Sequence, residues 1–234
     1  MIPPSERLIV ALDVPSASEA TKIVVSLGET VKFYKVGMQL YTAEGPKMVR
    51  DLIASGKLVF LDLKYHDIPN TVAAAVRGAV QLGVSMLTVH ASGGTKMLKA
   101  AVEASGVGTS KVSTKLVAIT VLTSMDEQQL HETGVRGELL DQVVKLGSIA
   151  LDAGCAGVVS SAREVKALRA RLGTGFLAVT PGVRPAGAAH GDQARVVTPA
   201  GAVAAGATHI VVGRPITTAP DPVAVAKKIL KEIA

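Results

Sequence analysis

Short apolar runs alternate with helix-like segments along the whole chain, and this alternation constrains the fold more than any other feature. The runs are rich in β-branched residues and read as continuously apolar rather than as alternating apolar and polar residues. Strands of this kind are typical of parallel sheets that are covered by helices. Eight such runs occur, at residues 8–14, 33–38, 58–64, 86–90, 116–122, 156–161, 176–183 and 209–214.

The segments between these runs carry apolar residues at helical spacing, and many end in glycine, which is favoured just after a helix. They include residues 16–29, 41–56, 70–83, 138–154 and 162–173. Eight strand–helix units in 234 residues predict an α/β fold, a (β/α)₈ TIM barrel that forms one domain over residues 1–234. The structural alternative is an open doubly wound sheet, which normally has fewer strands, and no GxGxxG motif follows the first run.

The apolar content limits where such a chain can reside. Hydrophobic residues make up 48% of the sequence, which is enough for a sizeable core, yet no apolar run approaches the roughly 18 residues of a membrane span. The segment MIPPSERLIVALD has no basic region ahead of its hydrophobic stretch, so we expect no signal peptide. The single cysteine, Cys155, excludes an internal disulfide and is typical of a reducing compartment. We therefore expect a cytoplasmic protein that does not enter a membrane.

The charge balance is basic, with a formal net charge of +6 at pH 7. The Lys and Arg residues are scattered, Trp is absent and aromatic residues make up only 3%, so the chain offers little surface on which bases could stack. We expect no nucleic-acid partner, although binding through the basic surface stays open as a weak alternative. A small anionic substrate suits the same charge.

Polar residues follow most of the predicted strands. In a (β/α)₈ enzyme the active site lies at the carboxyl ends of the strands, and a scaffold built only for stability would not need ionisable groups at so many of these ends. The residues found there are Asp13, Lys35, Asp62, Lys64, His90, Thr123, Ser160, Pro181, Arg184, Gly213 and Arg214.

The stretch LVFLDLKYHDIPNT, residues 58–71, places three of the charges close together. Side chains two apart on a strand point the same way, so Asp62 and Lys64 should face the same part of the barrel mouth. Charges at the edge of a core are costly to desolvate, which leaves a structural ion pair or a catalytic task as the two interpretations. Asp67 lies just past the strand, and its alternative role is an N-cap for the helix that follows.

A second group of candidates follows the last two strands. The Gly- and Ala-rich loop TPGVRPAGAAHGDQ, residues 180–193, comes after the seventh run, and GRPITTA, residues 213–219, comes after the eighth. Loops in these positions form the usual phosphate-binding corner of the barrel. Backbone N–H groups near Gly213 can hold an anion, and Arg184 and Arg214 can supply bidentate contacts.

The remaining polar candidates carry less chemistry. The histidines at positions 66, 90, 131, 190 and 209 show no metal-ligand spacing, so we expect no metal site. His90 is interpreted as a supporting or structural residue. Cys155 has no evident base near it in the sequence and is interpreted as a small buried hydrophobic residue.

The motifs together resemble the orotidine 5′-phosphate decarboxylase family, and the resemblance runs through the whole chain. The D-x-K-x-x-D core within DLKYHDIPNT is shared with other sugar-phosphate enzymes on the same barrel, whereas the full set of motifs is much more specific. The compact bacterial form of the family is similar in size. The set comprises ALDV, KVG, DLKYHDIPNT, LTSM, PGVRP, the GDQ that contains Gln193, and VGRPI.

The resemblance implies decarboxylation of orotidine 5′-phosphate to UMP, the last step of de novo UMP synthesis, without a cofactor. It implies that Lys64 stabilises and protonates a carbanion at C6 of the pyrimidine, that Asp62 faces the substrate carboxylate, and that Lys35 and Asp67 complete the charge network. It also implies a homodimer in which Asp67, Ile68 and Thr71 reach the site of the neighbouring subunit.

The family further implies how the substrate is held. Asp13 and Lys35 would contact the ribose, and Thr123 and Ser124 would contact the edge of the pyrimidine. The residues implied at the phosphate and in the loop beside it are Pro181, Arg184, Gln193, Gly213 and Arg214.

Three other functions stay open from the sequence. A 3-keto-gulonate 6-phosphate decarboxylase or a hexulose-phosphate synthase resembles the same D-x-K-x-x-D core, but binds Mg²⁺ and stabilises an enediolate. A non-catalytic nucleotide sensor could keep the barrel without the chemistry, although it would not need Lys64. Binding of nucleic acid is the third.

Overall fold

The computed structural model describes residues 2–106, 114–185 and 197–234, and its strands form a closed barrel. Every strand pairs in parallel with the next one along the chain, and β8 pairs with β1. The strands are β1 (Leu8–Ala11), β2 (Phe33–Gly37), β3 (Leu58–Tyr65), β4 (Met86–His90), β5 (Lys115–Ile119), β6 (Gly157–Val159), β7 (Leu177–Thr180) and β8 (His209–Val212). The predicted (β/α)₈ barrel is therefore confirmed.

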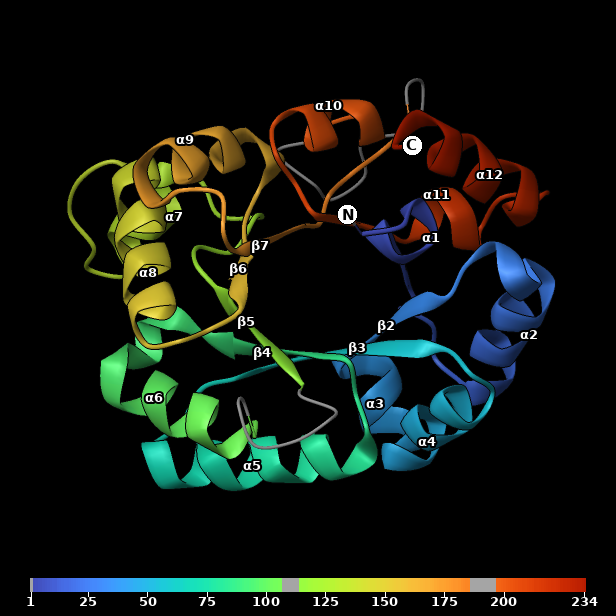
Figure 1. Ribbon diagram of the computed structural model, residues 1–234, viewed down its shortest axis with the longest axis horizontal. Helices are drawn as coiled ribbons and strands as arrows, with labels where there is room; N and C mark the ends of the chain where they lie inside the picture. Colours follow the sequence, from blue (N-terminus) through green and yellow to red (C-terminus); the bar gives the residue numbers. More distant parts are fainter. Residues whose placement is uncertain (1, 107–113, 186–196) are drawn as a thin grey trace.

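Helices surround the strands in a ring, as Figure 1 shows. Several begin with side-chain caps; Ser16, for example, accepts a hydrogen bond from the backbone N–H of Glu19 at the start of α2. The α-helices are α1 (Pro4–Arg7), α2 (Ala17–Leu27), α3 (Met38–Glu44), α4 (Pro46–Ala54), α5 (Pro69–Leu82), α6 (Gly94–Ala104), α7 (Glu127–Glu132), α8 (Leu139–Asp152), α9 (Ala162–Leu172), α10 (Pro199–Ala204), α11 (Arg214–Thr217) and α12 (Pro222–Glu232). Two 3₁₀ turns, η1 (Gly28–Thr30) and η2 (Ala91–Gly93), complete the regular structure of the described residues.

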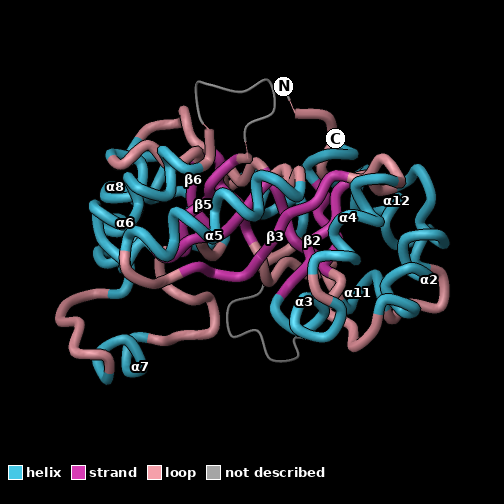
Figure 2. The backbone as a smooth tube through the Cα atoms, turned by 90° about the horizontal axis from the view of Figure 1, so that it is seen from below, coloured by secondary structure: helices cyan, strands magenta, loops and turns pink. Residues whose placement is uncertain are grey.

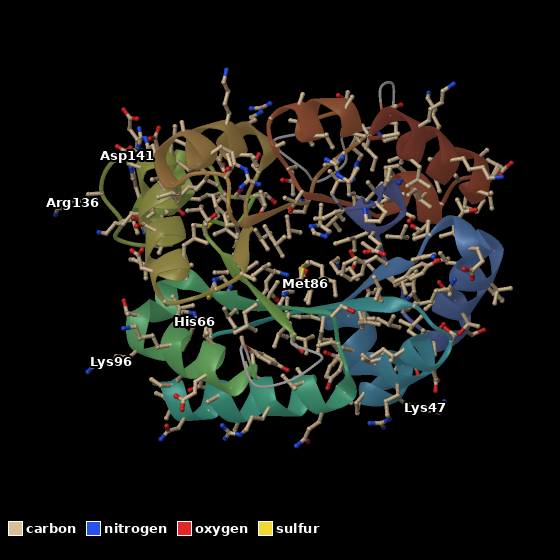
Figure 3. All side chains as sticks on the ribbon, in the orientation of Figure 1. Lys47, His66, Met86, Lys96, Arg136 and Asp141 are labelled. Carbon is tan, nitrogen blue, oxygen red and sulfur yellow. The ribbon has the colours of Figure 1, made fainter. Side chains whose placement is uncertain are left out.

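Alternate residues of the strands pack into two separate apolar layers. One side of each strand faces the barrel interior, where residues such as Ile9, Phe60 and Val179 pack together, and Figure 3 shows Met86 in the middle of the ring. The other side packs against the helices and forms the larger core. Because both sides are largely buried, most strand residues are apolar, which explains the apolar runs of the sequence.

One predicted helix is divided in the structure. Residues 41–56 were expected to form one helix, but α3 ends at Glu44 and α4 begins at Pro46. Gly45 between them has φ +65°, a left-handed conformation that glycine adopts without steric cost. Pro46, at the first position of α4, has no backbone N–H and cannot donate a hydrogen bond back to α3, so one helix ends and the next begins here. The apolar residues keep their helical spacing across the break.

The carboxyl ends of the strands lie at one end of the barrel. In Figure 2, α3, α7 and α11, which follow β2, β5 and β8, lie toward one edge of the molecule, and both termini lie toward the opposite edge. None of the helices in the described part of the chain is both long and apolar enough to cross a membrane.

Candidate active site

Four charged side chains form a connected row at the carboxyl ends of the first three strands. Lys35 Nζ lies 2.7 Å from Asp13 Oδ1 and 3.7 Å from Asp62 Oδ2. Lys64 Nζ lies 3.0 Å from both carboxylate oxygens of Asp62. The row therefore alternates in sign along Asp13, Lys35, Asp62 and Lys64.

Burial increases toward the middle of this row. The side chains of Lys35 and Asp62 are only 10% and 13% exposed, whereas that of Lys64 is 26% exposed and that of Asp13 is 55% exposed. Water screens the inner charges weakly, so each depends on its neighbour of opposite sign. Lys64 is bound to the row on one side and open to the barrel mouth on the other.

A cavity of about 390 Å³ opens beside the row. Four charged residues line it, Asp13, Lys35, Asp62 and Lys64, and most of the other lining residues are apolar. Residues that line the rest of the cavity are Gly37, Met38, Gln39, Phe60, Ile119, Val121, Leu122, Thr123, Ser124, Val159, Pro181 and Val211.

A second cavity of about 290 Å³ adjoins the first. The two share four lining residues, Asp13, Lys35, Pro181 and Val211. The second cavity adds the residues predicted to bind phosphate, which are Arg184, Gly213 and Arg214 together with Ala11, Gly182 and Thr217. The buried Arg184 donates from Nη1 to the carbonyl of Val183 at 3.1 Å.

The structure thus brings together most residues that the sequence selected. Gln193 lies outside the described residues, as do positions 186–196 of the loop after β7. Asp67, Ile68 and Thr71 line neither cavity and are exposed.

Two of the polar strand ends do not face the cavities. Ser160 follows β6, is fully buried and lines neither cavity, whereas its neighbour Val159 lines the first. His90 ends β4 without lining either cavity, and its ring stacks on that of His66 at 5.3 Å between centroids. Burial lowers the pKa of His90, and the neighbouring His66 and Lys64 lower it further while Asp62 opposes them. The neutral imidazole is favoured there, which agrees with the supporting role expected for His90.

The alternative role of Asp67 as an N-cap is wrong. Helix α5 begins at Pro69, its N-cap residue is Ile68, and no side chain caps it. Asp67 Oδ1 instead accepts a hydrogen bond from the backbone N–H of Ile68 at 2.6 Å. Ile68 itself is 67% exposed, which is unusual for a large aliphatic side chain that follows a buried strand.

Two residues of the site were missed in the sequence. A Cβ atom on Gly37 would lie 2.8 Å from Asp13 Oδ1 and 2.9 Å from Lys35 Nζ, so any larger residue there would force that ion pair to shift. The signal was its position two residues after Lys35, on the same face of β2. Thr88 on β4 donates a hydrogen bond to Asp62 Oδ1 at 3.1 Å, and no sequence pattern marks it.

The described residues contain no group of three or more His, Cys, Asp or Glu side chains that could hold a metal ion. Cys155 is buried, and burial raises the pKa of its thiol to about 12, which agrees with its interpretation as an apolar residue. Among the described residues that line the first cavity, Lys35 and Lys64 are the only ones with a basic side chain.

Comparisons with known proteins agree with this geometry. Residues 6–229 match the family model described as "Orotidine 5'-phosphate decarboxylase / HUMPS family". The chain is 52% identical over 233 residues to an orotidine 5′-phosphate decarboxylase of Halorhodospira halophila, with 100% of this chain and 98% of the relative covered. It is 49% identical over 232 residues to the protein of that name in Moorella thermoacetica, with 97% and 92% covered.

The same likeness extends to three dimensions. A crystal structure of orotidine 5′-phosphate decarboxylase from Lactobacillus acidophilus superposes with a TM-score of 0.87 at 41% sequence identity, covering 97% of this chain and 99% of that one. The family model matches nearly the whole length, and relatives at about half identity cover it from end to end. The chain therefore belongs to the orotidine 5′-phosphate decarboxylase/HUMPS family.

Proposed function

We propose that the protein decarboxylates orotidine 5′-phosphate to UMP in pyrimidine biosynthesis, and that residues 1–234 form one catalytic domain. The observation that carries the proposal is the placement of Lys64. Its ammonium lies 3.0 Å from both oxygens of Asp62, and Lys64 borders a cavity whose uncharged lining residues are mostly apolar. A cation held this way is already in place before charge develops on a substrate.

The chemistry requires such a cation. Loss of CO₂ from C6 of the pyrimidine leaves an electron pair in the plane of the ring, where the π system cannot spread it. Preorganised charge in a site that excludes water is the most effective way to stabilise such an anion. Lys64 provides the charge and then donates a proton to C6, which yields UMP. The proposal includes no cofactor and no metal, because the ammonium of Lys64 supplies the cation and the proton.

Asp62 faces the carboxylate that leaves as CO₂. Two carboxylates close together repel each other, and this repulsion falls as neutral CO₂ departs and the negative charge moves to C6. We rank this contribution below the stabilisation by Lys64. Asp62 contacts the ammonium groups of Lys35 and Lys64 at 3.7 and 3.0 Å, and these contacts hold its carboxylate in place beside the cavity.

The two adjoining cavities support a two-part substrate. The pyrimidine would lie in the larger cavity against Thr123 and Ser124, with the ribose at Asp13 and Lys35, which line both cavities. The phosphate would lie in the smaller cavity. We assign its binding to Arg184, Gly213 and Arg214, with Gln193 and Pro181 from the loop after β7.

A homodimer completes the proposed site. Asp67, Ile68 and Thr71 are exposed and line neither cavity of their own chain. The exposed aliphatic side chain of Ile68 suits an interface with a partner subunit. We propose that these three residues reach the site of the partner subunit, where Asp67 would extend the row of alternating charges beyond Lys64. The free thiol of Cys155 supports a reducing, cytoplasmic location.

One assay tests the reaction. Purified protein in EDTA should remove the ultraviolet absorbance of orotidine 5′-phosphate, with UMP as the product. Activity that requires Mg²⁺ and acts on a sugar phosphate instead would favour the sugar-phosphate branch, and UMP binding without turnover would favour the nucleotide sensor. Tight binding to generic DNA at physiological salt would favour the nucleic-acid function.

A further inference from the structure

Thr88 lies on β4 opposite the charged end of β3, and its side chain is fully buried. Its hydroxyl makes two hydrogen bonds. Oγ1 accepts from the backbone N–H of Lys64 at 2.8 Å and donates to Asp62 Oδ1 at 3.1 Å. Since a hydroxyl has a single proton, donation to Asp62 leaves its lone pairs for Lys64. One side chain therefore binds the backbone of one charged residue and the carboxylate of the other.

The pairing of β3 with β4 is irregular at this point. Leu61 pairs with Leu87 and Tyr65 pairs with Val89, so residues 62–64 stand opposite Thr88 alone. Extra residues in a strand form a bulge, which interrupts the ladder and re-aims side chains. The Thr88 hydroxyl accepts the Lys64 N–H within this bulge.

Lys64 has an unusual backbone as well. Its φ of +53° is the only positive value at a non-glycine residue in the described part of the chain. This left-handed conformation is disfavoured for a residue with a side chain and persists only where its surroundings enforce it. Because φ determines the direction in which Cβ leaves the backbone, it also determines where the ammonium of Lys64 can reach.

We propose that Thr88 is a positioning residue for the reaction. Its hydroxyl holds Lys64 in the left-handed conformation and fixes the Asp62 carboxylate at the orientation in which both oxygens contact the Lys64 ammonium. Thr88 lines neither cavity, so it acts through these two residues and does not touch substrate. This inference rests on the proposed decarboxylation.

Two matched pairs of side chains isolate the hydroxyl. Thr88→Val keeps the shape of threonine and removes the oxygen, and Thr88→Ser keeps the oxygen and removes the methyl group. Thr88→Ala, compared with Thr88→Ser, removes the oxygen without any risk of overpacking, so it serves if the valine variant does not fold. Thr114→Val is the control, because the buried Thr114 hydroxyl donates to the Val84 carbonyl just before β5, at the opposite end of the barrel.

The expected result is a loss of kcat with substrate binding retained. Thr88→Val and Thr88→Ala should lower kcat by roughly 10- to 100-fold, the effect of misplacing a catalytic group by about 1 Å. KM and the Kd for UMP should change by less than about threefold, because the loss is in the transition state. Thr88→Ser should restore kcat to within about threefold of wild type, and Thr114→Val should cost stability without loss of kcat.

A second comparison tests the route of action. If Thr88 acts through Lys64, Thr88→Val should lower kcat much less in a Lys64→Ala enzyme than in the wild-type enzyme. The reason is that the effects of residues that act as a unit are not additive. Equal kcat in Thr88→Val and wild type, or in Thr88→Ala and Thr88→Ser, would overturn the positioning role. If wild-type protein fails to decarboxylate orotidine 5′-phosphate at all, the proposed function fails instead, so the two failures are distinguishable.

Discussion

At the scale of single residues, the row of Asp13, Lys35, Asp62 and Lys64 explains why charges are tolerated at the edge of the core. Two carboxylates and two ammonium groups give the row no net charge, and every contact joins opposite signs. Desolvation makes such a row costly, and apolar residues of similar volume would often be as stable. A catalytic task accounts for its presence better than stability does.

The residues of this row could be predicted because they lie at or just after the carboxyl ends of the first three strands, which meet at one end of the barrel, whereas the bulge that positions Lys64 could not. Ser160 was selected for the same reason but lines neither cavity, whereas Val159, the last residue of β6, lines the first. A shift of one position reverses the face. Thr88 was missed because its importance depends on contacts with a neighbouring strand, which no local pattern encodes, and Gly37 was missed although its spacing from Lys35 was a local signal.

The first prediction concerns Arg214, which lines the smaller cavity. Arg214→Ala should lower kcat/KM by roughly 2–5 kcal/mol in equivalent free energy, as expected when one member of a buried charge pair is truncated. Binding energy from the remote phosphate is used to organise the reacting end of the substrate. Steady-state kinetics measures the change.

Arg171→Ala is the matched control for this variant. Arg171 forms an ion pair with Asp141 at 2.7 Å between α9 and α8, where it borders neither cavity, and its loss should leave kcat/KM unchanged. An Arg214→Ala enzyme with an unaltered KM would show that Arg214 does not contact the phosphate.

At the scale of elements, the strands were predictable and the short helices were not. Most strand residues are buried on both sides of the sheet, and so each strand produces a largely apolar run. Helices α7 and α11 have six and four residues, too few for a helical period to be recognised. The division between α3 and α4 was missed because apolar residues continue at helical spacing across Gly45.

The second prediction concerns β8 and the pH dependence of stability. His209 begins this strand, is 6% exposed, and packs edge-on against Phe33 with 6.1 Å between ring centroids. Burial lowers the pKa of His209 from 6.5 to about 4, and the charge of Arg7 adds to the shift. The unfolded chain binds a proton on this ring below about pH 6.5 and the folded protein does not, so acidification favours unfolding.

The free energy of unfolding should therefore fall as the pH drops from about 6.5 toward 4, and His209 should account for about 3 kcal/mol of the loss. Denaturant unfolding of wild type and His209→Asn at several pH values measures this contribution. Asparagine can take the contact of Nδ1 with the Thr208 hydroxyl, which is 3.0 Å away. The variant should show a shallower pH dependence, and parallel curves for the two proteins would contradict the assignment.

At the scale of the whole molecule, the barrel brings residues from the first, second, third and eighth strands to one end. Asp13, Lys64 and Arg214 are far apart in the sequence and meet because the sheet closes between β1 and β8. The exposed residues Asp67 and Ile68 extend this arrangement to a second chain in the proposed dimer.

The third prediction tests that shared site. Lys64→Ala and Asp67→Ala homodimers should each be nearly inactive. Each mixed dimer would have one doubly altered site and one intact site, because Lys64 of one chain works with Asp67 of the other. Unfolding and refolding an equal mixture should return about a quarter of wild-type activity, since half of the dimers are mixed and half of their sites are intact. No recovery, with mixed dimers demonstrated by mass spectrometry, would exclude a shared site.

The account depends most on Lys64, and kcat of Lys64→Ala with orotidine 5′-phosphate is its most direct test. General acid catalysis alone contributes roughly 10²–10⁴-fold, and Lys64 also stabilises the anion, so the loss of kcat should exceed that range. UMP should still bind, as calorimetry can establish, because the cavities and the phosphate site are unchanged. A Lys64→Ala enzyme that folds, binds UMP and retains more than about a tenth of wild-type kcat would contradict the role of Lys64 and, with it, the proposed mechanism.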